Sequence, residues 1–257
     1  MTHRTTMHVG PLGSTIHVLR ADAQTVEQLA AIDWNRRFRR VCLDPVRGVV
    51  TLMSPSRLHE DLSEMLGELV GGAADTLGRA SRGLRSTRLR GRGEPPGTGM
   101  EPDCTFYIGE RADGFLTALA EGESTADEYL ERNAPDLVVE VELTNADTGK
   151  AERYGQIGVR ELWRLHARKE SREISADFLA LQPEDPPRLL TASQVLEGLT
   201  PADVCEAVEG VRFGRTRAER TEAVARIVRR RGAVRVREDE APYTTSAETV
   251  SATVREV

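Results

Sequence analysis

The 257-residue sequence predicts an α/β fold, in which a mixed central β-sheet is flanked by helices. Residues 136–163 pass from the two-residue alternation of a strand through a turn into a helix and then a second short strand. Residues 55–70 carry the apolar stripe of an amphipathic helix, which needs an apolar surface to cover. Two hairpins, around residues 41–53 and 84–108, would supply the remaining strands of the sheet.

The strand–helix–strand region gives the most detailed prediction. Residues 136–143 alternate as a strand requires, so Glu140 and Glu142 point to the same side. A turn rich in Asn, Asp and Gly leads into a helix over residues 150–157, which ends at a glycine. Residues 161–165 form the next strand. Two carboxylates therefore end one strand, and a lysine begins the helix that follows it.

The N-terminal part is less regular. Residues 1–24 lack a clear periodicity and are predicted to be a loose lead-in. A capping box at Thr25 begins a short helix, and the hairpin of residues 41–53 follows it. The helix over residues 55–70 has proline at its first position and is predicted to end near Gly71.

A dense group of arginines precedes residue 93, without an acidic residue among them: Arg79, Arg82, Arg85, Arg88, Arg90 and Arg92. Two interpretations stay open. The arginines could contact phosphates and position a DNA duplex without reading its sequence. Alternatively, they could form the solvent-exposed face of a strand.

The second half of the chain contains one insertion and a tail. Residues 110–133 are acidic and are predicted to be a surface insertion with one helix around residues 126–132; a lid or partner surface is the alternative to an ordinary loop. A strand over residues 173–181 and short helices within residues 191–208 follow. Residues 211–257 are arginine-rich and then polar, and are predicted to be largely disordered, with a candidate helix over residues 223–228.

The composition is that of one folded domain in a reducing compartment. The chain is 39% hydrophobic and can bury one sizeable core, which we assign to residues 25–210. A net charge of −6 excludes a nucleic-acid coat, although local basic patches could still contact DNA. Three widely spaced cysteines, Cys42, Cys104 and Cys205, argue against disulfides and structural zinc. Because we find no signal peptide or membrane span, we expect a cytoplasmic protein.

Lysine is used selectively. Of 35 basic side chains, only Lys150 and Lys169 are lysine. An ammonium is a compact charge whose pKa shifts on burial, whereas a guanidinium stays protonated. A helix start also attracts phosphate through its free N–H groups. Carboxylates that can hold a divalent metal, an ammonium and such a helix start are together the parts of a phosphodiester hydrolysis site.

Four stretches carry a resemblance to a known family: Glu101-Pro102-Asp103, Ala134 to Glu140, Lys150 with Tyr154, and Gly158 to Trp163. In these stretches the sequence resembles the Uma-type family of putative restriction endonucleases, within the PD-(D/E)XK nuclease superfamily. The resemblance runs from about residue 25 to about residue 211. It implies a restriction-endonuclease-like fold and a metal-dependent endonuclease that hydrolyses DNA phosphodiester bonds.

The same resemblance implies the site residues. The superfamily's aspartate falls on Asp103 and its glutamate on Glu140, both as catalytic residues and metal ligands. The usual lysine position holds Glu142, a further candidate metal ligand. In this family the lysine comes from the following helix, which here means Lys150. His59, near the start of the first long helix, is the candidate for a polar group presented to the metal site.

The implied cofactor is Mg²⁺, with Mn²⁺ as an alternative, because carboxylate oxygens suit hard divalent ions. Lys150 would hold or activate the attacking water, whereas Tyr154, one turn further on, is expected to pack. The implied partner is DNA, with a homodimer as a candidate assembly and no membrane contact.

Two other functions stay open. A catalytically inactive nuclease-fold protein could serve as a nucleic-acid-binding or interaction module. It is favoured by Glu142 in the lysine position and by Val41-Cys42, where many family members carry an acidic residue. A glycoside hydrolase built on a carboxylate pair is disfavoured, because only 4% of the residues are aromatic and sugar sites usually need aromatic faces.

Overall fold

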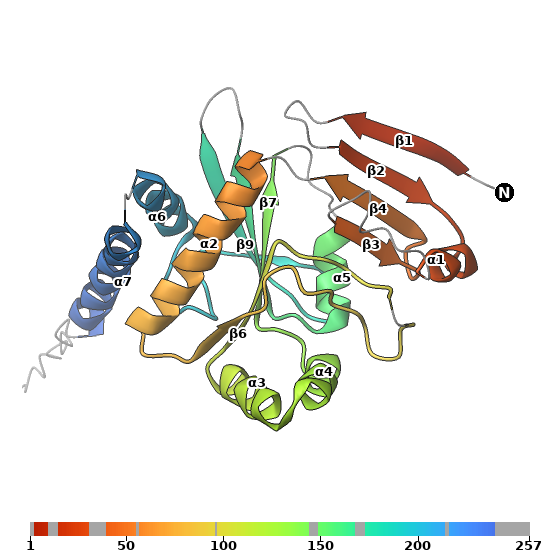
Figure 1. Ribbon diagram of the computed structural model, residues 1–257. Helices are drawn as coiled ribbons and strands as arrows, with labels where there is room; N and C mark the ends of the chain where they lie inside the picture. The colour runs from red at the N-terminus through yellow and green to blue at the C-terminus, as the bar shows by residue number, and fades with distance from the viewer. Residues whose placement is uncertain are drawn as a thin grey trace, which may run out of the picture.

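A computed structural model describes residues 3–9, 15–30, 40–54, 57–95, 97–143, 149–167, 173–213 and 216–239. Pro55, Lys169 and the predicted tail beyond residue 239 lie outside these ranges. The described residues form two β-sheets and the helices around them (Figure 1). The α/β, restriction-endonuclease-like fold with a mixed central sheet and flanking helices is confirmed.

The central sheet has the strand order β10-β9-β8-β7-β6-β5. Its strands are β5 (Ser81–Gly83), β6 (Cys104–Ile108), β7 (Leu137–Glu142), β8 (Glu161–Ala167), β9 (Ile174–Ala180) and β10 (Arg188–Leu190). Strands β7 and β8 are parallel because helix α5 (Gly149–Ile157) connects them as a crossover, and the other neighbours are antiparallel. The predicted strand–helix–strand unit therefore lies at the centre of the sheet.

The second sheet has the order β1-β2-β4-β3 and is antiparallel throughout. Its strands are β1 (His3–Val9), β2 (Thr15–Arg20), β3 (Arg40–Asp44) and β4 (Val49–Ser54). Two predictions were wrong here: residues 3–9 and 15–20 of the predicted loose lead-in are strands, and the hairpin of residues 41–53 does not join the central sheet. Both edges of β4 are already bonded, to β2 and to β3. An isolated bridge between Leu43 and Gly99 links the two parts.

Helices cover both faces of the central sheet (Figure 1). Helix α2 (Arg57–Thr76) packs its apolar stripe on one face, against Val139 and Val141 among others. Helix α5 packs on the other face, where Tyr154 contacts the cluster around Val138. Alternate residues of β7 thus face opposite helices, and both sets are buried. Although α2 has 20 residues, neither it nor any other described helix is long and apolar enough to span a bilayer.

Two helix boundaries differ from the prediction. Helix α1 (Ala23–Leu29) is capped by Asp22, whose Oδ1 accepts a hydrogen bond from the Thr25 backbone at 2.8 Å, so Thr25 is not the cap. Helix α2 continues past Gly71 to Thr76. Ala73 and Ala74 are fully buried, so the core contacts of the apolar stripe outweigh the low helix propensity of Gly71 and Gly72.

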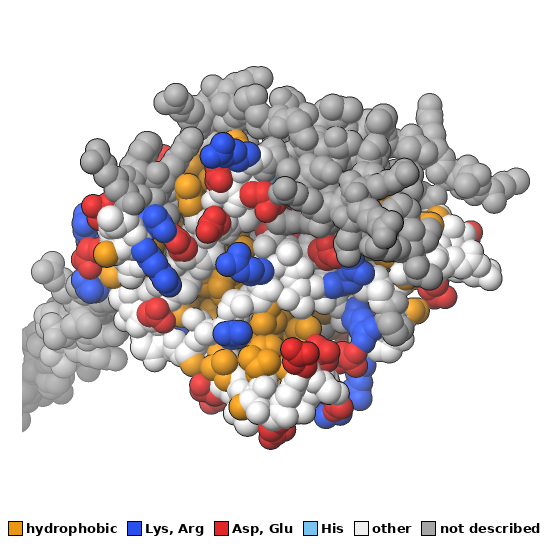
Figure 2. All heavy atoms as spheres, in the orientation of Figure 1, with side chains coloured by type: hydrophobic (Ala, Val, Ile, Leu, Met, Phe, Trp, Pro, Cys, Tyr) orange, Lys and Arg blue, Asp and Glu red, His pale blue; other side chains and the backbone are white. Residues whose placement is uncertain are grey.

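The arginine group does not form one exposed strand face. Of these six arginines, only Arg82 lies in a strand, β5. Leu89 makes an isolated bridge to Met100, which closes the predicted hairpin. Several of the arginines pair with acids: Arg79 with Glu197, Arg88 with Glu101, and Arg90 with Glu131. On the face drawn in Figure 2, basic side chains are likewise interspersed with acidic ones rather than gathered into one patch.

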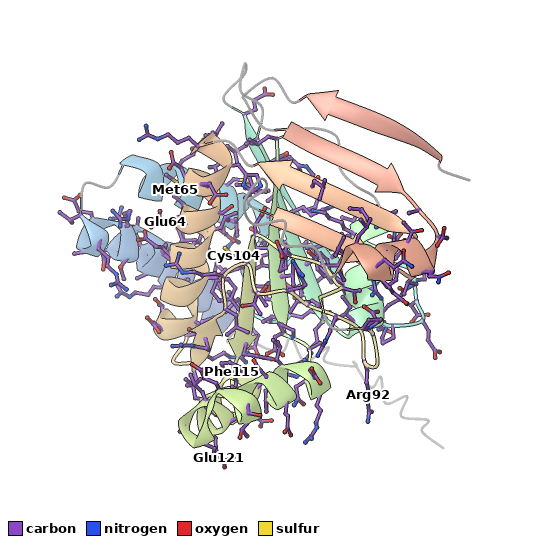
Figure 3. The ribbon with its side chains drawn as sticks, turned by 45° about the vertical axis from the view of Figure 1, so that its right-hand side comes forward. Glu64, Met65, Arg92, Cys104, Phe115 and Glu121 are labelled. Carbon is purple, nitrogen blue, oxygen red and sulfur yellow. The ribbon has the colours of Figure 1, made fainter. Side chains whose placement is uncertain are left out.

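The acidic insertion is a pair of helices, α3 (Glu110–Glu121) and α4 (Glu123–Arg132), of which the sequence predicted the second. Tyr107 of β6 stacks on Phe115 with ring centroids 5.1 Å apart, and meets the edge of Tyr129 at 5.6 Å. Figure 3 shows Phe115 on the side of α3 that faces the sheet and Glu121 on its outer side. Aromatic packing therefore attaches the insertion to the sheet.

The segment after residue 211, predicted to be largely disordered apart from a candidate helix over residues 223–228, contains a much longer helix that includes those residues. Helix α6 (Pro201–Phe213) and helix α7 (Arg217–Asp239) pack together and against α2 (Figure 1). Val224, Ile227 and Val228 lie on the buried face of α7, at helical spacing. This short apolar stripe lies within the candidate helix of residues 223–228, and its burial against the core stabilises a helix that extends well beyond them.

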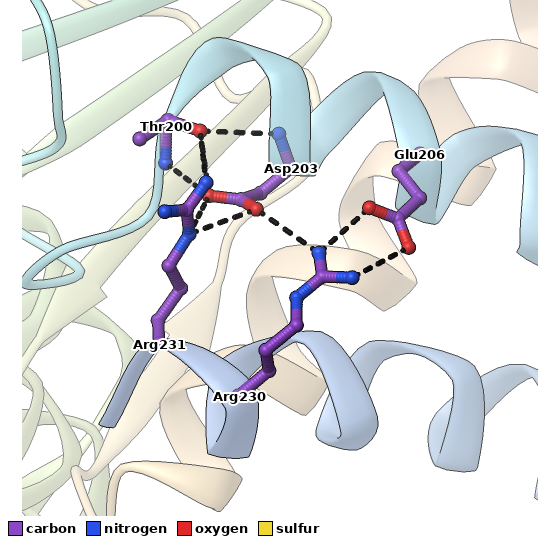
Figure 4. A network of polar contacts seen from close by, with 5 residues as sticks. All are labelled: Thr200, Asp203, Glu206, Arg230 and Arg231. Atoms are coloured by element: carbon purple, nitrogen blue, oxygen red, sulfur yellow. Dashed lines mark hydrogen bonds and ion pairs between the residues drawn. The ribbon is translucent and has the colours of Figure 1, made fainter. Parts of the chain in front are cut away.

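A polar network joins α6 to α7 (Figure 4). Thr200 and Asp203 form a reciprocal capping box at the start of α6. Asp203 is 2% exposed and also accepts hydrogen bonds from Arg231 at 2.8 Å and 3.0 Å. Burial of Asp203 opposes its ionisation, but the hydrogen bonds from Arg231 and Thr200 prevail and hold its pKa below 3.8.

Asparagine in place of Asp203 is expected to lower the free energy of unfolding by about 2 kcal/mol, because hydrogen bonds to a buried charged group are lost. Urea unfolding at neutral pH measures this change. Because the folded pKa lies below the unfolded value, the stabilisation is present above pH 3.8 and is lost as the pH falls through the folded pKa. The variant should lack that part of the acid dependence.

The matched control is Glu206→Gln, in the same network but with a side chain 55% exposed. Its ion pair with Arg230 is at the surface, so the expected change is below about 1 kcal/mol. Equal losses in the two variants would contradict the importance of burial at Asp203.

Candidate active site

Polar side chains from four parts of the chain meet at one end of the central sheet. They are Asp103, just before β6, Glu140 of β7, His59 of α2 and Lys150 of α5. Cys104 of β6 pairs with Val139 of β7, so extending the register by one residue places Asp103 opposite Glu140. Cys104 is labelled in Figure 3, beside α2, with its Sγ 3.2 Å from the carbonyl oxygen of Ser63.

Asp103 is held on two sides. Its Oδ2 accepts a hydrogen bond from the backbone N–H of Val141 at 2.6 Å and lies 3.2 Å from Nε2 of His59. Asp103 and His59 are each 5% exposed. Since Val141 directly follows Glu140, the first contact ties the aspartate to the backbone next to the second carboxylate. His59 reaches the carboxylate from α2, as the family resemblance implied for a polar group on this helix.

Glu140 is 3% exposed, and both of its oxygens accept hydrogen bonds from α5. Nζ of Lys150 lies 2.9 Å from Oε2, and the hydroxyl of Tyr154 lies 2.5 Å from Oε1. Lys150 and Tyr154 are four residues apart, so they share one face of the helix. Tyr154 packs, as predicted, with no exposed surface. The sequence analysis missed its hydrogen bond, although the spacing of four from Lys150 was a usable signal.

Glu142, in the usual lysine position, belongs to a different set of contacts. It stands opposite His166 in the β7–β8 register, and its Oε2 lies 3.2 Å from Nδ1 of His166. The other ring nitrogen of His166 is 3.0 Å from Asp177 of β9. Burial raises the pKa of the Glu142 carboxyl, and the charge of His166 opposes that rise. The structure therefore directs Glu142 toward β8, and the sequence analysis had not singled out His166.

The comparison with protein families decides the classification. The family model Uma2, described as a putative restriction endonuclease, matches residues 25–205, which is more than half of the chain. The chain belongs to the Uma2 family. His59, Asp103, Glu140 and Lys150 all lie inside the matched range. No curated protein matches the chain. Membership of the Uma2 family supports a nuclease role.

Uma2 membership raises the question of a divalent metal, since nucleases of this kind generally use one. Within the described ranges, no three His, Cys, Asp or Glu side chains are grouped so that they could hold a metal ion. Mg²⁺ usually keeps several waters and takes only one or two carboxylates together with substrate phosphate. Asp103 and Glu140, two oxygen donors at the same end of adjacent strands, fit that kind of site.

One further group near the lysine of this Uma2 protein is a thiol. Sγ of Cys42 in β3 lies 3.1 Å from the carbonyl oxygen of Gly99. The positive charge of Lys150 acts to lower the pKa of this thiol. Burial raises the pKa of Cys42 to about 12, which the neighbouring ammonium offsets only in part. Because the thiolate is the nucleophilic form, the raised pKa disfavours Cys42 as a nucleophile.

Proposed function

We propose that this protein is a metal-dependent endonuclease that hydrolyses phosphodiester bonds of DNA. The observation that carries the proposal is the contact of Lys150 with Glu140 at 2.9 Å, with Asp103 bonded to the backbone beside that glutamate. Two acidic groups and an ammonium from three separate elements are thereby placed together. Membership of the Uma2 family supports the same chemistry.

Each residue has a proposed role. Asp103 and Glu140 would hold Mg²⁺ or Mn²⁺ through carboxylate oxygen, and such an ion supplies a Lewis acid that activates water and polarises a phosphate. The ammonium of Lys150 would orient the attacking water and offset negative charge that develops on the phosphate. Tyr154 and His59 would fix the orientations of the two carboxylates, because each contacts one of them directly.

The direct test is cleavage of supercoiled plasmid DNA by the purified protein. We expect nicked and linear products with Mg²⁺ or Mn²⁺ and no products in EDTA. Alanine in place of Asp103 should abolish the products, because one of the two proposed oxygen ligands is lost. Alanine at Glu101, a partly buried neighbour paired with Arg88, is the control and should retain cleavage.

A second function is favoured by specific observations. Glu142 occupies the position of the superfamily's usual lysine, and both oxygens of Glu140 accept hydrogen bonds from the chain itself. An inactive nuclease fold that binds nucleic acid would be consistent with both. Binding of DNA without cleavage of plasmid, oligonucleotide or RNA substrates under any divalent metal would support this function and overturn the hydrolase.

A further inference from the structure

Helix α5 carries another charged side chain, which the proposed mechanism does not use. Arg153 is three positions after Lys150 and directly before Tyr154, so it lies on a neighbouring side of the same turn of the helix. Its side chain is only 3% exposed, whereas arginine is almost never buried without partners. The partners that offset this burial come from two other parts of the chain.

Both partners are carboxylates. Asp44, at the end of β3 and 1% exposed, has its Oδ1 3.4 Å from Nε of Arg153. Glu94, in the loop of the hairpin that leads into β6, accepts a hydrogen bond from Nη2 of the same guanidinium. A methyl group on Gly91 would overlap Oε1 of Glu94, so this carboxylate is folded back against its own loop. Arg153 thus ties α5 both to the N-terminal sheet and to the hairpin.

This network is poorly suited to add stability. Among the described residues, Oδ2 of Asp44, Oε2 of Glu94 and Nε of Arg153 have no hydrogen-bond partner although they are buried. Moving charges out of water costs free energy that only good pairing recovers, and apolar residues of similar size often serve as well. What the charges add is direction. A guanidinium bonds in a fixed plane, whereas the apolar contacts of Ala151 and Tyr154 are non-directional.

We propose that Arg153 is a positioning residue, which fixes the rotation and depth of α5 so that the two donors of this helix reach Glu140. These donors, the ammonium of Lys150 and the hydroxyl of Tyr154, lie 2.9 Å and 2.5 Å from the carboxylate, and such bonds weaken steeply with angle. A small rotation of this nine-residue helix would misplace the ammonium. At 3% exposure, Arg153 acts through these donors rather than on the substrate. This inference rests on the proposed function, because it names what holds the proposed water-orienting donor.

Arg153→Met alone would leave two buried carboxylates unpaired, which is strongly destabilising. The test variant therefore removes all three charges and keeps the side-chain sizes, by Asp44→Asn, Glu94→Gln and Arg153→Met. Single-turnover cleavage of plasmid DNA over a range of protein concentrations gives a maximal rate and a half-saturating concentration. We expect the maximal rate to fall by about 10²-fold, as for a misplacement of about 1 Å at an active site. The half-saturating concentration should not change, because the buried network does not present its charges to DNA.

A second readout does not depend on activity. The chain has two lysines, Lys150 and Lys169, so protein labelled with ¹⁵N at lysine Nζ gives one ammonium signal for each, and Lys169→Arg identifies that of Lys150. An ammonium held by a carboxylate exchanges its protons with water slowly, whereas a released one exchanges fast and its signal broadens. In the triple variant, without metal or DNA, we expect the Lys150 signal to broaden.

Two further variants separate positioning from a general loss of stability. Asp203→Asn lowers stability in the α6–α7 network, away from α5, and should leave the maximal rate and the Lys150 signal unchanged. Glu94→Gln alone keeps an acceptor for Arg153 but removes one charge, so it should reproduce both effects in weaker form. It also carries the test if the triple variant does not fold.

The outcomes are distinguishable. If the parent cuts DNA and the folded triple variant cuts it at the same maximal rate, this inference is overturned and the proposed function stands. The inference is also overturned if Asp203→Asn lowers the rate as much, or if only the half-saturating concentration rises. If the triple variant does not fold, cleavage by Glu94→Gln at the parent rate overturns the inference. If the parent cuts no DNA, the proposed function fails, and an unchanged Lys150 signal would overturn the positioning role as well.

Discussion

Glutamine in place of Glu140 is expected to lower the rate of DNA cleavage by at least roughly 10³-fold. A bound metal ion stabilises the transition state by several kcal/mol, and the substitution removes one of its two proposed anionic ligands. The substitution keeps the volume of the side chain. The amide oxygen can still accept from Lys150, and the hydroxyl of Tyr154 can accept from the amide nitrogen, so the packing need not change. Single-turnover cleavage at saturating protein measures the loss.

Stability has to be followed in the same experiment, because the substitution removes the partner of a buried ammonium. The side chain of Lys150 is 21% exposed, so water can compensate in part, and we expect the variant to remain folded at 25 °C. Glu152→Gln is the matched control: this glutamate is exposed on α5, and its loss should be silent. A Glu140→Gln protein that cuts DNA at the parent rate would remove Glu140 from the site.

Arginine in place of Lys150 is expected to lower turnover by about 10²–10³-fold, the usual cost of losing one electrostatic donor in an active site. The charge is kept, but a compact ammonium is exchanged for a wide planar fork. Glu140 would still have a cationic partner, whereas the water-orienting donor would be misplaced. DNA binding mainly senses charge and should change little. The measurement is turnover and DNA affinity on the same preparation.

Lys169→Arg is the control for this exchange, since Lys169 is the chain's other lysine; it lies outside the described residues and was chosen from the sequence alone. It should be silent. If Lys150→Arg cut DNA as well as the parent, the ammonium would have no special role. Attention would then return to Glu142 and His59 as sources of the missing chemistry.

Much of the candidate site could be predicted from the sequence, because its parts are close together in the chain. The alternation of β7, the turn after it and the helical spacing of α5 are patterns of neighbouring residues, so they can be read without knowing the fold. The paired strand β8 follows from the same crossover. The family resemblance added Asp103 and His59, which lie far from Glu140 in sequence. The structure then places Asp103 and His59 in contact, and Lys150 against Glu140.

What could not be predicted depends on partners distant in the sequence. The period-two pattern of β3 and β4 shows that they are strands but not which sheet they join, because every strand edge offers the same backbone groups. The position of α7 on α2 is set by a few apolar residues among many arginines, and their burial depends on a surface formed 150 residues earlier. The same holds for Asp44. Its sequence neighbours indicate a turn, and only the packing of that turn on α5 brings its carboxylate to Arg153.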